Sequence, residues 1–392
     1  MAVRITSEDE LKRLVETLPF QSIADTPTVR YYTKWEVYKE YMGMDYAAKE
    51  DQLPEQLNKV IEDARTIVLG KELRAAKMPG GVNVEDLGRE GVSTSNGRLK
   101  PFSLVRYDTG KMQAYHALRY NQGVGIYIDR GTDFGKIAIV SLGGDGYLGH
   151  HIVLEVGDGA RGEILFIDYH GSRGLKTLVF ESSIGASAEV EFTNIALHSK
   201  ESAVYTLREI YIGEKASITQ SYLLSGGRMT RFQDDNILEG RLSKLEARAS
   251  SVARPSTSSD IILSSLHHGA ESEGDVRARG VVVGNGYLAQ RGVAMLGETA
   301  KLAASEVESY IFLLSENGKG YAVPVLEIHT GDITRAGHSA AVASLAEDTV
   351  FYLRSRGLSE KEIVKLVMEG IGRFSGVIEK TGIDFGWLVD FH

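Results

Sequence analysis

The side chains with the clearest capacity for chemistry lie near the C-terminal end of the chain. His338 stands alone in the segment AGHSAAV, and Glu327 and His329 are two residues apart in LEIHTGD. Residues two apart on a strand share one face, so Glu327 and His329 could bind one metal ion together. A solvated ion pair is the commoner role for two such residues, and a packing role is the alternative for His338.

Cysteine is absent from the whole sequence. This excludes disulfides, thiolate metal sites and a cysteine nucleophile. The formal net charge of −9 argues against a broad nucleic-acid surface. The chain has no P-loop motif, so it lacks this nucleotide-binding signature. It also has no run of eighteen apolar residues, so we expect no membrane association. The charged N-terminal sequence lacks the apolar core of a signal peptide, so we expect a cytoplasmic protein.

Adjacent polar residues occur at three further places: His150-His151, His267-His268 and Asp234-Asp235. Neighbours on a strand point to opposite faces, so an adjacent pair cannot chelate one ion, and we expect corner or surface histidines. Asp234 and Asp235, with Glu239 nearby, supply carboxylates. A β-helix enzyme acting on acidic or carbohydrate polymers would need such groups to converge on one face. This enzyme is the alternative function that the sequence leaves open.

The elements that must position these residues are mostly strands. From about Lys100 onward, short runs rich in Val, Ile, Leu, Tyr and Phe alternate with Gly or Asp. Glycine recurs at intervals of 28, 28, 27 and 29 residues, at Gly157, Gly185, Gly213, Gly240 and Gly269. A fixed period with strand content indicates a β-solenoid, whose coils bury aliphatic side chains against one another. We expect the glycines to supply the φ values that the corners need.

Helical patterns flank this region. Ser7 and Glu10 form a capping box, and a second helix is expected at about 53–64. Near the C-terminus an amphipathic stretch from Glu347 to Arg356 ends at Gly357. We therefore predict three domains. They are an N-terminal helical domain (1–75), a mainly β core (76–333) and a C-terminal helical domain (334–392).

A second capping box, Ser359 with Glu362, opens the last predicted helix. Glycines at 370, 372 and 376 weaken its helix propensity, and we expect a break or a change of direction there.

The segments VLEIHTGDITRAGHSAAV and FYLRSRGLSEKE, with the solenoid period upstream, resemble the SufB/SufD family. Members of that family are scaffolds of the SUF iron–sulfur cluster assembly machinery. The likeness runs from roughly Asp108 to Arg373. It implies a right-handed parallel β-helix core between N-terminal and C-terminal α-helical domains. It also implies a non-catalytic scaffold that docks a SufC-type ABC ATPase and pairs through its β-helix, either with itself or with a SufB-like protomer.

The resemblance places ATPase docking on the C-terminal helices. We predict a docking surface that includes Phe351, Tyr352, Arg354, Arg356, Leu358 and Ile363. Some of these apolar side chains must instead be buried, whereas arginine is favoured at interfaces. We expect ATP binding to dimerise two docked ATPases, to move the helical domain and to shift the β-helix interface near His338.

The family's functional residues transfer only in part. SufB-like members carry His-Glu where this chain has His338-Ser339, and SufD-like members carry Cys-Ser-His at 336–338, where this chain has Ala, Gly and His. The counterpart nearest to a reactive cysteine of SufB-like members is Gly292. A persulfide needs a thiolate, and a nascent cluster usually needs sulfur ligands. We therefore expect a SufD-like partner that receives no sulfur.

We expect no tightly bound cofactor. Transient binding of iron, or of a nascent iron–sulfur cluster, would use His338 with Glu327 or His329.

Overall fold

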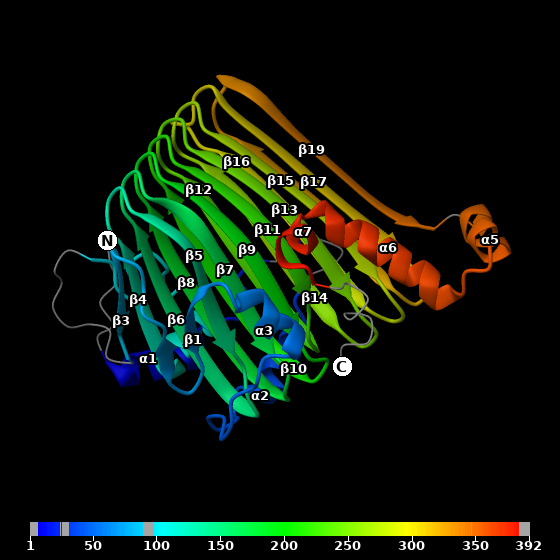
Figure 1. Ribbon diagram of the computed structural model, residues 1–392, viewed down its shortest axis with the longest axis horizontal. Helices are drawn as coiled ribbons and strands as arrows, with labels where there is room; N and C mark the ends of the chain where they lie inside the picture. Colours follow the sequence, from blue (N-terminus) through cyan, green and yellow to red (C-terminus); the bar gives the residue numbers. More distant parts are fainter. Residues whose placement is uncertain (1–6, 24, 26–30, 89–97, 346, 384–392) are drawn as a thin grey trace.

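The computed structural model describes residues 7–23, 25, 31–88, 98–345 and 347–383. The middle of the chain winds into a parallel β-solenoid of about eight turns between residues 122 and 344 (Figure 1). Each turn contributes one strand to each of two sheets. The predicted mainly β, parallel solenoid fold is therefore confirmed.

The first sheet, which we call the even sheet, has nine strands in the described chain. Its strands are β3 (Val82–Asp86), β4 (Gln122–Ile128), β6 (Gly146–Val156), β8 (Gly174–Ile184), β10 (Ser202–Ile212), β12 (Met229–Leu238), β14 (Ser258–His267), β16 (Tyr287–Leu296) and β18 (Lys319–Ile328).

The second sheet, the odd sheet, has ten strands within the same described ranges. Its strands are β1 (Arg65–Leu69), β2 (Leu73–Ala75), β5 (Asp133–Leu142), β7 (Arg161–His170), β9 (Glu189–His198), β11 (Ser217–Ser225), β13 (Lys244–Ala253), β15 (Glu273–Val282), β17 (Ala303–Leu313) and β19 (Ile333–Ser344).

The main core lies between the two sheets, where inward-facing side chains of successive coils stack. Phe166, Phe180 and Phe192 are buried there, with ring centroids 5.7 and 6.4 Å apart along the stack. Residues paired in the parallel ladders lie on the same face of a sheet. Inward and outward side chains therefore form columns along the solenoid, and the face of a residue follows from that of its ladder partner.

The repeated glycines lie at the corners after the even-numbered strands, but the predicted reason for them is wrong. None of the five adopts a positive φ. A Cβ at Gly240 would instead lie 2.1 Å from the backbone nitrogen of Glu214, in the corner of the preceding coil. The left-handed backbone occurs two residues after each glycine, at Gly159, Ser187, Lys215, Leu242 and Glu271. Glycine is needed because stacked corners leave no room for a side chain.

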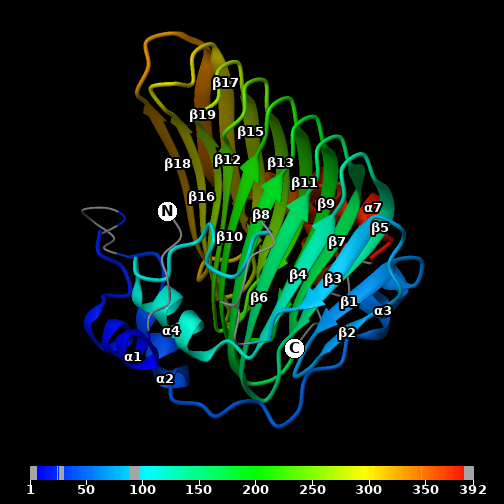
Figure 2. The same ribbon diagram turned by 90° about the vertical axis from the view of Figure 1, so that its left-hand side faces the viewer.

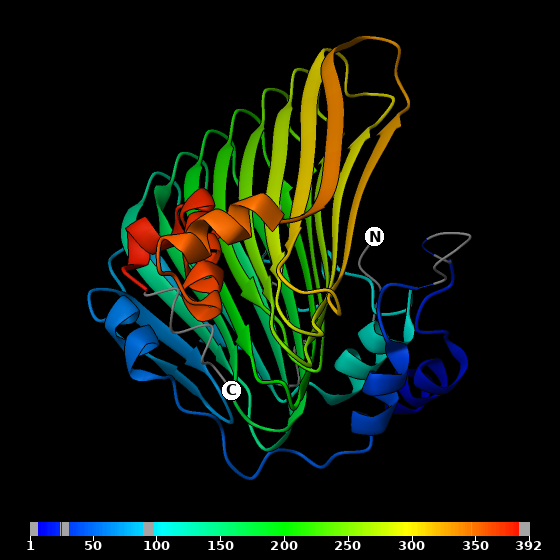
Figure 3. The same cartoon turned by 90° about the vertical axis from the view of Figure 1, so that its right-hand side faces the viewer.

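Helices cover the outer faces of both sheets. On the even sheet, α2 (Trp35–Tyr41) and α4 (Lys111–Arg119) pack near its N-terminal end, and α1 (Glu8–Thr17) packs on α4 (Figure 2). On the odd sheet, the covering helices are α3 (Glu55–Ile61), α6 (Glu360–Phe374) and α7 (Val377–Thr381) (Figure 3). The remaining helix, α5 (Glu347–Ser355), projects beyond the sheets (Figure 1).

Two predicted segment boundaries differ from the structure. The N-terminal segment 1–75 contains β1 and β2 in addition to helices, and the last strand, β19, extends to Ser344 inside the segment predicted as helical. The reason is that β19 pairs with β17 along its whole length, so tertiary pairing extends the solenoid into a stretch without strong strand signals.

Helix α6 begins at the predicted capping box, in which Ser359 and Glu362 bond reciprocally. The helix continues through Gly370 and Gly372 and ends before Gly376, which has a positive φ of 77°. Burial of Met368 and Ile371 against the odd sheet outweighs the low helix propensity of the first two glycines.

Candidate functional site

The C-terminal end of the solenoid is open in the described part of the chain. β18 is the last strand of the even sheet and β19 is the last strand of the odd sheet, and each has a ladder partner on one side only. Their free edges present backbone N–H and C=O groups without a strand partner. Such edges can pair with a strand of another chain.

His338 lies at this open end, on the inner face of β19. Its ladder partner Val307 is buried in the solenoid interior, so the imidazole points toward the same interior column. The side chain is nevertheless exposed, because no further coil covers it. Its imidazole makes no hydrogen bond or ion pair with any described residue. The structure thus leaves both ring nitrogens of His338 available at the end of the solenoid.

Glu327 and His329 do not join His338. Glu327 pairs in the ladder with Met295, whose two neighbours are buried inside, so Glu327 faces outward from the even sheet. Its carboxylate lies 3.7 Å from His329 Nε2, and both side chains are more than half exposed. Across the described ranges, no group of three His, Asp or Glu side chains is arranged to hold a metal ion. Within one chain, His338 therefore does not lie on the same face as Glu327, its predicted companion.

The other inward-facing side chains at the open end are apolar. Leu326 and Ala336 pack against the last buried cluster of the interior. Ile328 and Val342 occupy inward-facing ladder positions, yet each is 43 % exposed. An apolar surface of this kind around one histidine is typical of a face that another protein covers.

Gly292 occupies the position that the resemblance relates to a reactive cysteine. It lies on β16 and faces the interior, where a Cβ would lie 2.3 Å from Val307 Cγ1. The side chain of Val307 thus fills the volume that a thiol at 292 would need. Val307 is also the ladder partner of His338. The interior of this chain is therefore filled by side chains at Gly292.

The predicted docking residues fall on the projecting α5, on the loop after it and on α6. Phe351 is 75 % exposed and Tyr352 is 55 % exposed. Arg354 is exposed, and the guanidinium of Arg356 lies over the Tyr352 ring at 5.2 Å. Leu358 is half-buried. These five residues remain a candidate contact surface.

Ile363 differs from the others, because it is only 4 % exposed. It lines the junction of α6 with the ends of β17 and β19, so its side chain is not exposed to a partner in this structure, and its role in docking stays a prediction. An apolar groove of about 400 Å³ lies beside it, where α5, α6 and the ends of β17 and β19 meet. Leu313, Leu314 and Val350 line this groove.

The adjacent histidines on β6 are buried, whereas a corner or surface position was expected. They face opposite sides of the even sheet, as predicted. His150 forms a hydrogen bond with Ser141 on the inner side, and His151 forms one with Glu181, at 2.6 Å, on the outer side. His151 Nδ1 also lies 3.2 Å from Nε2 of His116, on α4. Burial, with His151 and His150 nearby, holds the pKa of His116 well below its usual value. These contacts fasten α4 to the even sheet.

The second pair fits the expectation better. His267 is buried against Ser272, and His268 is exposed at a corner beside Glu239.

The carboxylates of Asp234 and Asp235 diverge. Asp234 lies inside the solenoid, 3.2 Å from Arg208, and accepts a hydrogen bond from Tyr222. Asp235 faces outward and accepts a hydrogen bond from Ser264. Because one points inward and the other outward, they cannot act together on a polymer, and the enzyme alternative loses the pair on which it rested.

Glu209 was not among the predicted residues. It pairs in the ladders with both Asp235 and Glu181 on the outer face of the even sheet. Burial, together with Asp235 and Glu181, raises the pKa of Glu209 to about 8. Only the stacking of distant repeats brings these carboxylates into one row, so sequence spacing carried no direct signal.

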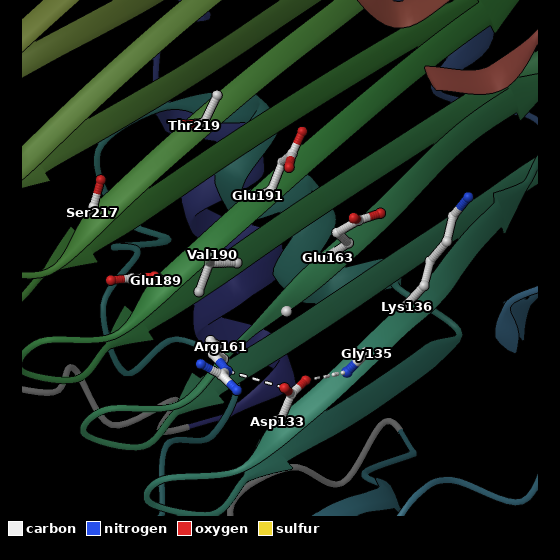
Figure 4. A pocket seen from close by; sticks show the side chains of 11 residues that line it. Asp133, Gly135, Lys136, Arg161, Glu163, Glu189, Val190, Glu191, Ser217 and Thr219 are labelled. Carbon is white, nitrogen blue, oxygen red and sulfur yellow. Dashed lines mark hydrogen bonds and ion pairs between the residues drawn. The ribbon is translucent and has the colours of Figure 1, made fainter. Parts of the chain in front are cut away.

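A wide groove of about 720 Å³ runs over the outer face of β5, β7, β9 and β11 (Figure 4). Its charged side chains have both signs, and Arg161 pairs with Asp133 at 3.0 Å. Glu163 and Glu191 stand on neighbouring strands, but Glu191 is already paired with Lys380 of α7. Glu191 is therefore not free to act in acid–base chemistry in this groove.

Together these features define a two-sheet parallel β-solenoid with an open, partly apolar end and a projecting helical arm. The sequence profile of the SUF system FeS cluster assembly SufBD core domain matches residues 140–371, more than half of the chain. The chain belongs to this family, and it is a SufBD-family iron–sulfur cluster assembly protein.

Individual relatives are more distant. The iron–sulfur cluster assembly protein SufD of Bacillus subtilis is 26% identical over 275 residues, which cover 68% of this chain and 62% of that protein. A SufBD family protein of Mycobacterium bovis is 26% identical over 51% of this chain and 23% of its own length. A SufBD family protein of Staphylococcus epidermidis is 21% identical over 51% of this chain and 43% of its own length. The chain thus spans less than two thirds of these curated relatives.

Among the described residues, no helix is both long enough and apolar enough to cross a membrane.

Proposed function

We propose that this chain is a SufD-like, cysteine-free scaffold of a SUF complex, which docks a SufC-type ABC ATPase and pairs with a second scaffold protomer. The observation that carries the proposal is the open end of the solenoid, where two unpaired strand edges and an apolar inner face surround His338. An isolated chain would expose this surface to water, so a partner that covers it is favoured.

The second protomer would meet the open end through β18 and β19. Main-chain hydrogen bonds along the free edges would give affinity, and Ile328 and Val342 would supply apolar contact. The partner is either a second copy or a SufB-like protomer. Only a cysteine-bearing partner could receive sulfur, because this chain contains no thiol.

His338 would contribute an imidazole to iron at the interface between protomers. Imidazole is a suitable ligand for Fe(II), and this one points toward the surface that the partner would cover. Soft sulfur ligands would then come from the partner, which fits a chain whose own interior at Gly292 is filled.

Replacing His338 by alanine should leave the assembled complex intact and reduce cluster formation by about tenfold or more, since even an outer-shell partner of a metal ligand is worth about 10–100-fold. Cluster formation would be followed by absorbance after reconstitution with iron and a sulfur donor. His329→Ala is the matched control, because His329 is exposed and outside the open end. Full cluster formation in His338→Ala, with the same complex mass, would assign His338 to packing alone.

The ATPase would dock on α5, whose exposed Phe351 and Tyr352 have few contacts within this chain. Buried aromatic and arginine side chains dominate most interfaces. Arg354 and Arg356 add positive charge beside these rings.

Reversing the charge at Arg354 and Arg356 (to Glu) should weaken ATPase binding by about tenfold or more. Binding would be measured by calorimetry with the purified ATPase. Arg161→Glu, an equally exposed arginine on β7, is the control and should bind normally. Unchanged affinity in the double variant would remove α5 from the docking surface.

The test of the whole proposal is co-purification with the SufC-type ATPase of the same organism, followed by light scattering. A complex of scaffold chains with ATPases supports the proposal. Absence of any complex with ATP, with ADP and without nucleotide would contradict it, and polymer-degrading activity should then be assayed.

A further inference from the structure

A stacked arginine side chain connects the end of the C-terminal helix α6 to strand β17, the neighbour of the last strand of the odd sheet. Arg279 on β15 lies between two rings, with its guanidinium 4.5 Å from the Phe374 ring and 4.2 Å from the Tyr310 ring. Phe374 is the last residue of α6, and Tyr310 lies on β17. The same guanidinium also pairs with Glu308 of β17 at 3.2 Å. Arg279 thus contacts the helix and the neighbouring strand at once.

The contact continues to β19. The hydroxyl of Tyr310 lies 3.3 Å from the hydroxyl of Ser339, a hydrogen bond in which either can donate. Ser339 lies within β19 and is the residue that follows His338. A continuous series of contacts therefore runs from the end of α6, through Arg279 and Tyr310, to the strand that carries His338.

α6 has further contacts along its length. Near its start, Ile363 and Val364 line the apolar groove at the ends of β17 and β19. Met368 and Ile371 pack into the outer apolar cluster of the odd sheet, and Ser250 of β13 donates a hydrogen bond to the Ile371 carbonyl. α7 is held by Lys380, which bonds Ser221 of β11. The contacts of Met368, Ile371 and Lys380 fix α6 and α7 to earlier coils, whereas Arg279 ties the last residue of α6 to β17.

We propose that Arg279 is a positioning residue that couples movement of the C-terminal helices to β19 and His338. The inference rests on the proposed function, because it gives docking on α5 and α6 a physical route to the open end. Displacement of α6 would pull Phe374 away from the guanidinium, or carry the guanidinium and Tyr310 with it. Either change alters the hydrogen bond between Tyr310 and Ser339 of β19. These contacts couple α6 to β19 only if removing the Arg279 guanidinium changes the position of both elements.

Arg277 provides a matched control on the same strand and the same face. It pairs with Asp275, Glu306 and Glu308, as Arg279 pairs with Glu308, but within the described chain it stacks on no ring. Arg279→Met and Arg277→Met each remove one guanidinium from this surface. Only the first removes the stacking of a guanidinium on Phe374 of α6.

The absence of cysteine makes a direct measurement simple. Gly370→Cys on α6 and Ala343→Cys on β19 introduce two thiols for spin labels into a chain without background thiols. Position 370 has open space around a new Cβ. Electron paramagnetic resonance then gives the distance distribution between α6 and β19. We expect Arg279→Met to broaden or shift this distribution, and Arg277→Met to leave it unchanged. Identical distributions in the two variants overturn the inference.

The second arm uses the docked ATPase. In the parent scaffold, ATP should change the signal of a single label at Ala343→Cys. In Arg279→Met that change should be lost, while ATPase affinity and the urea midpoint of the scaffold stay as in Arg277→Met. A nucleotide response that persists in Arg279→Met overturns the coupling. If no ATPase binds to the parent, the proposed function fails, and the distance measurement on the scaffold alone still decides whether Arg279 joins α6 to β19.

Discussion

Replacing Asp168 by alanine is expected to destabilise the protein by about 3–5 kcal/mol, because it leaves a buried ammonium group without its counter-ion. Asp168 and Lys176 are both fully buried and form an ion pair inside the solenoid. Thr206 also donates a hydrogen bond to Asp168, at 3.0 Å. Burial alone would raise the pKa of this carboxyl, but Lys176 and His198 outweigh burial and hold that pKa below its usual value.

The change in stability would be measured from urea unfolding at pH 7. Glu273→Ala is the control, since Glu273 pairs with Lys244 on the surface and its loss should cost less than about 1 kcal/mol. The double variant Asp168→Leu/Lys176→Met removes both charges and should recover much of the loss. A loss for Asp168→Ala no greater than that of the surface control would show that the pair does not stabilise the interior.

Replacing Glu209 by glutamine should stabilise the protein by about 2–3 kcal/mol at pH 8, after allowance for partial exposure to water. The amide is close in shape to the protonated carboxyl that the folded state prefers, and it removes repulsion from Asp235 and Glu181. The folded pKa of Glu209, about 8, lies above its ordinary value of 4.5. The stability that this proton supplies is therefore complete below pH 4.5 and is lost as the pH rises toward 8.

The difference between Glu209→Gln and the parent should thus be close to zero near pH 4.5 and largest at pH 8. Urea midpoints at a series of pH values would follow it. Glu163→Gln on the exposed face of β7 is the control and should change stability little at any pH. A Glu209→Gln protein that is no more stable than the parent at pH 8 would mean that the row of carboxylates is screened by solvent.

Much of the architecture was accessible from the sequence because it is local or periodic. The recurrence of glycine at about 28 residues indicated one coil per repeat, and the capping box at Ser359 and Glu362 marked the start of α6. The physical role of the corner glycines was not accessible. The clash at Gly240 involves the corner of the preceding coil, and sequence spacing does not reveal how closely two corners stack.

The candidate site was predicted in part. His338 was selected as an isolated histidine, and the structure places it at the open end of the solenoid. Its grouping with Glu327 and His329 failed, because the register of two different sheets directs Glu327 outward and His338 inward. Ile363 was assigned to an exposed surface, yet α6 uses it for packing. Amphipathic spacing shows that a helix has an apolar face but does not show what covers it.

The sequence by itself determined the solenoid period, the flanking helices, the absence of thiol chemistry and the likeness to the SufB/SufD family. These features follow from composition and from interactions within a repeat. Only the tertiary structure decided which strands end the sheets, where Arg279 meets Phe374, and which carboxylates share a row. Each of these depends on contacts between residues far apart in the chain, whose geometry is set by the stacking of whole coils and not by local sequence.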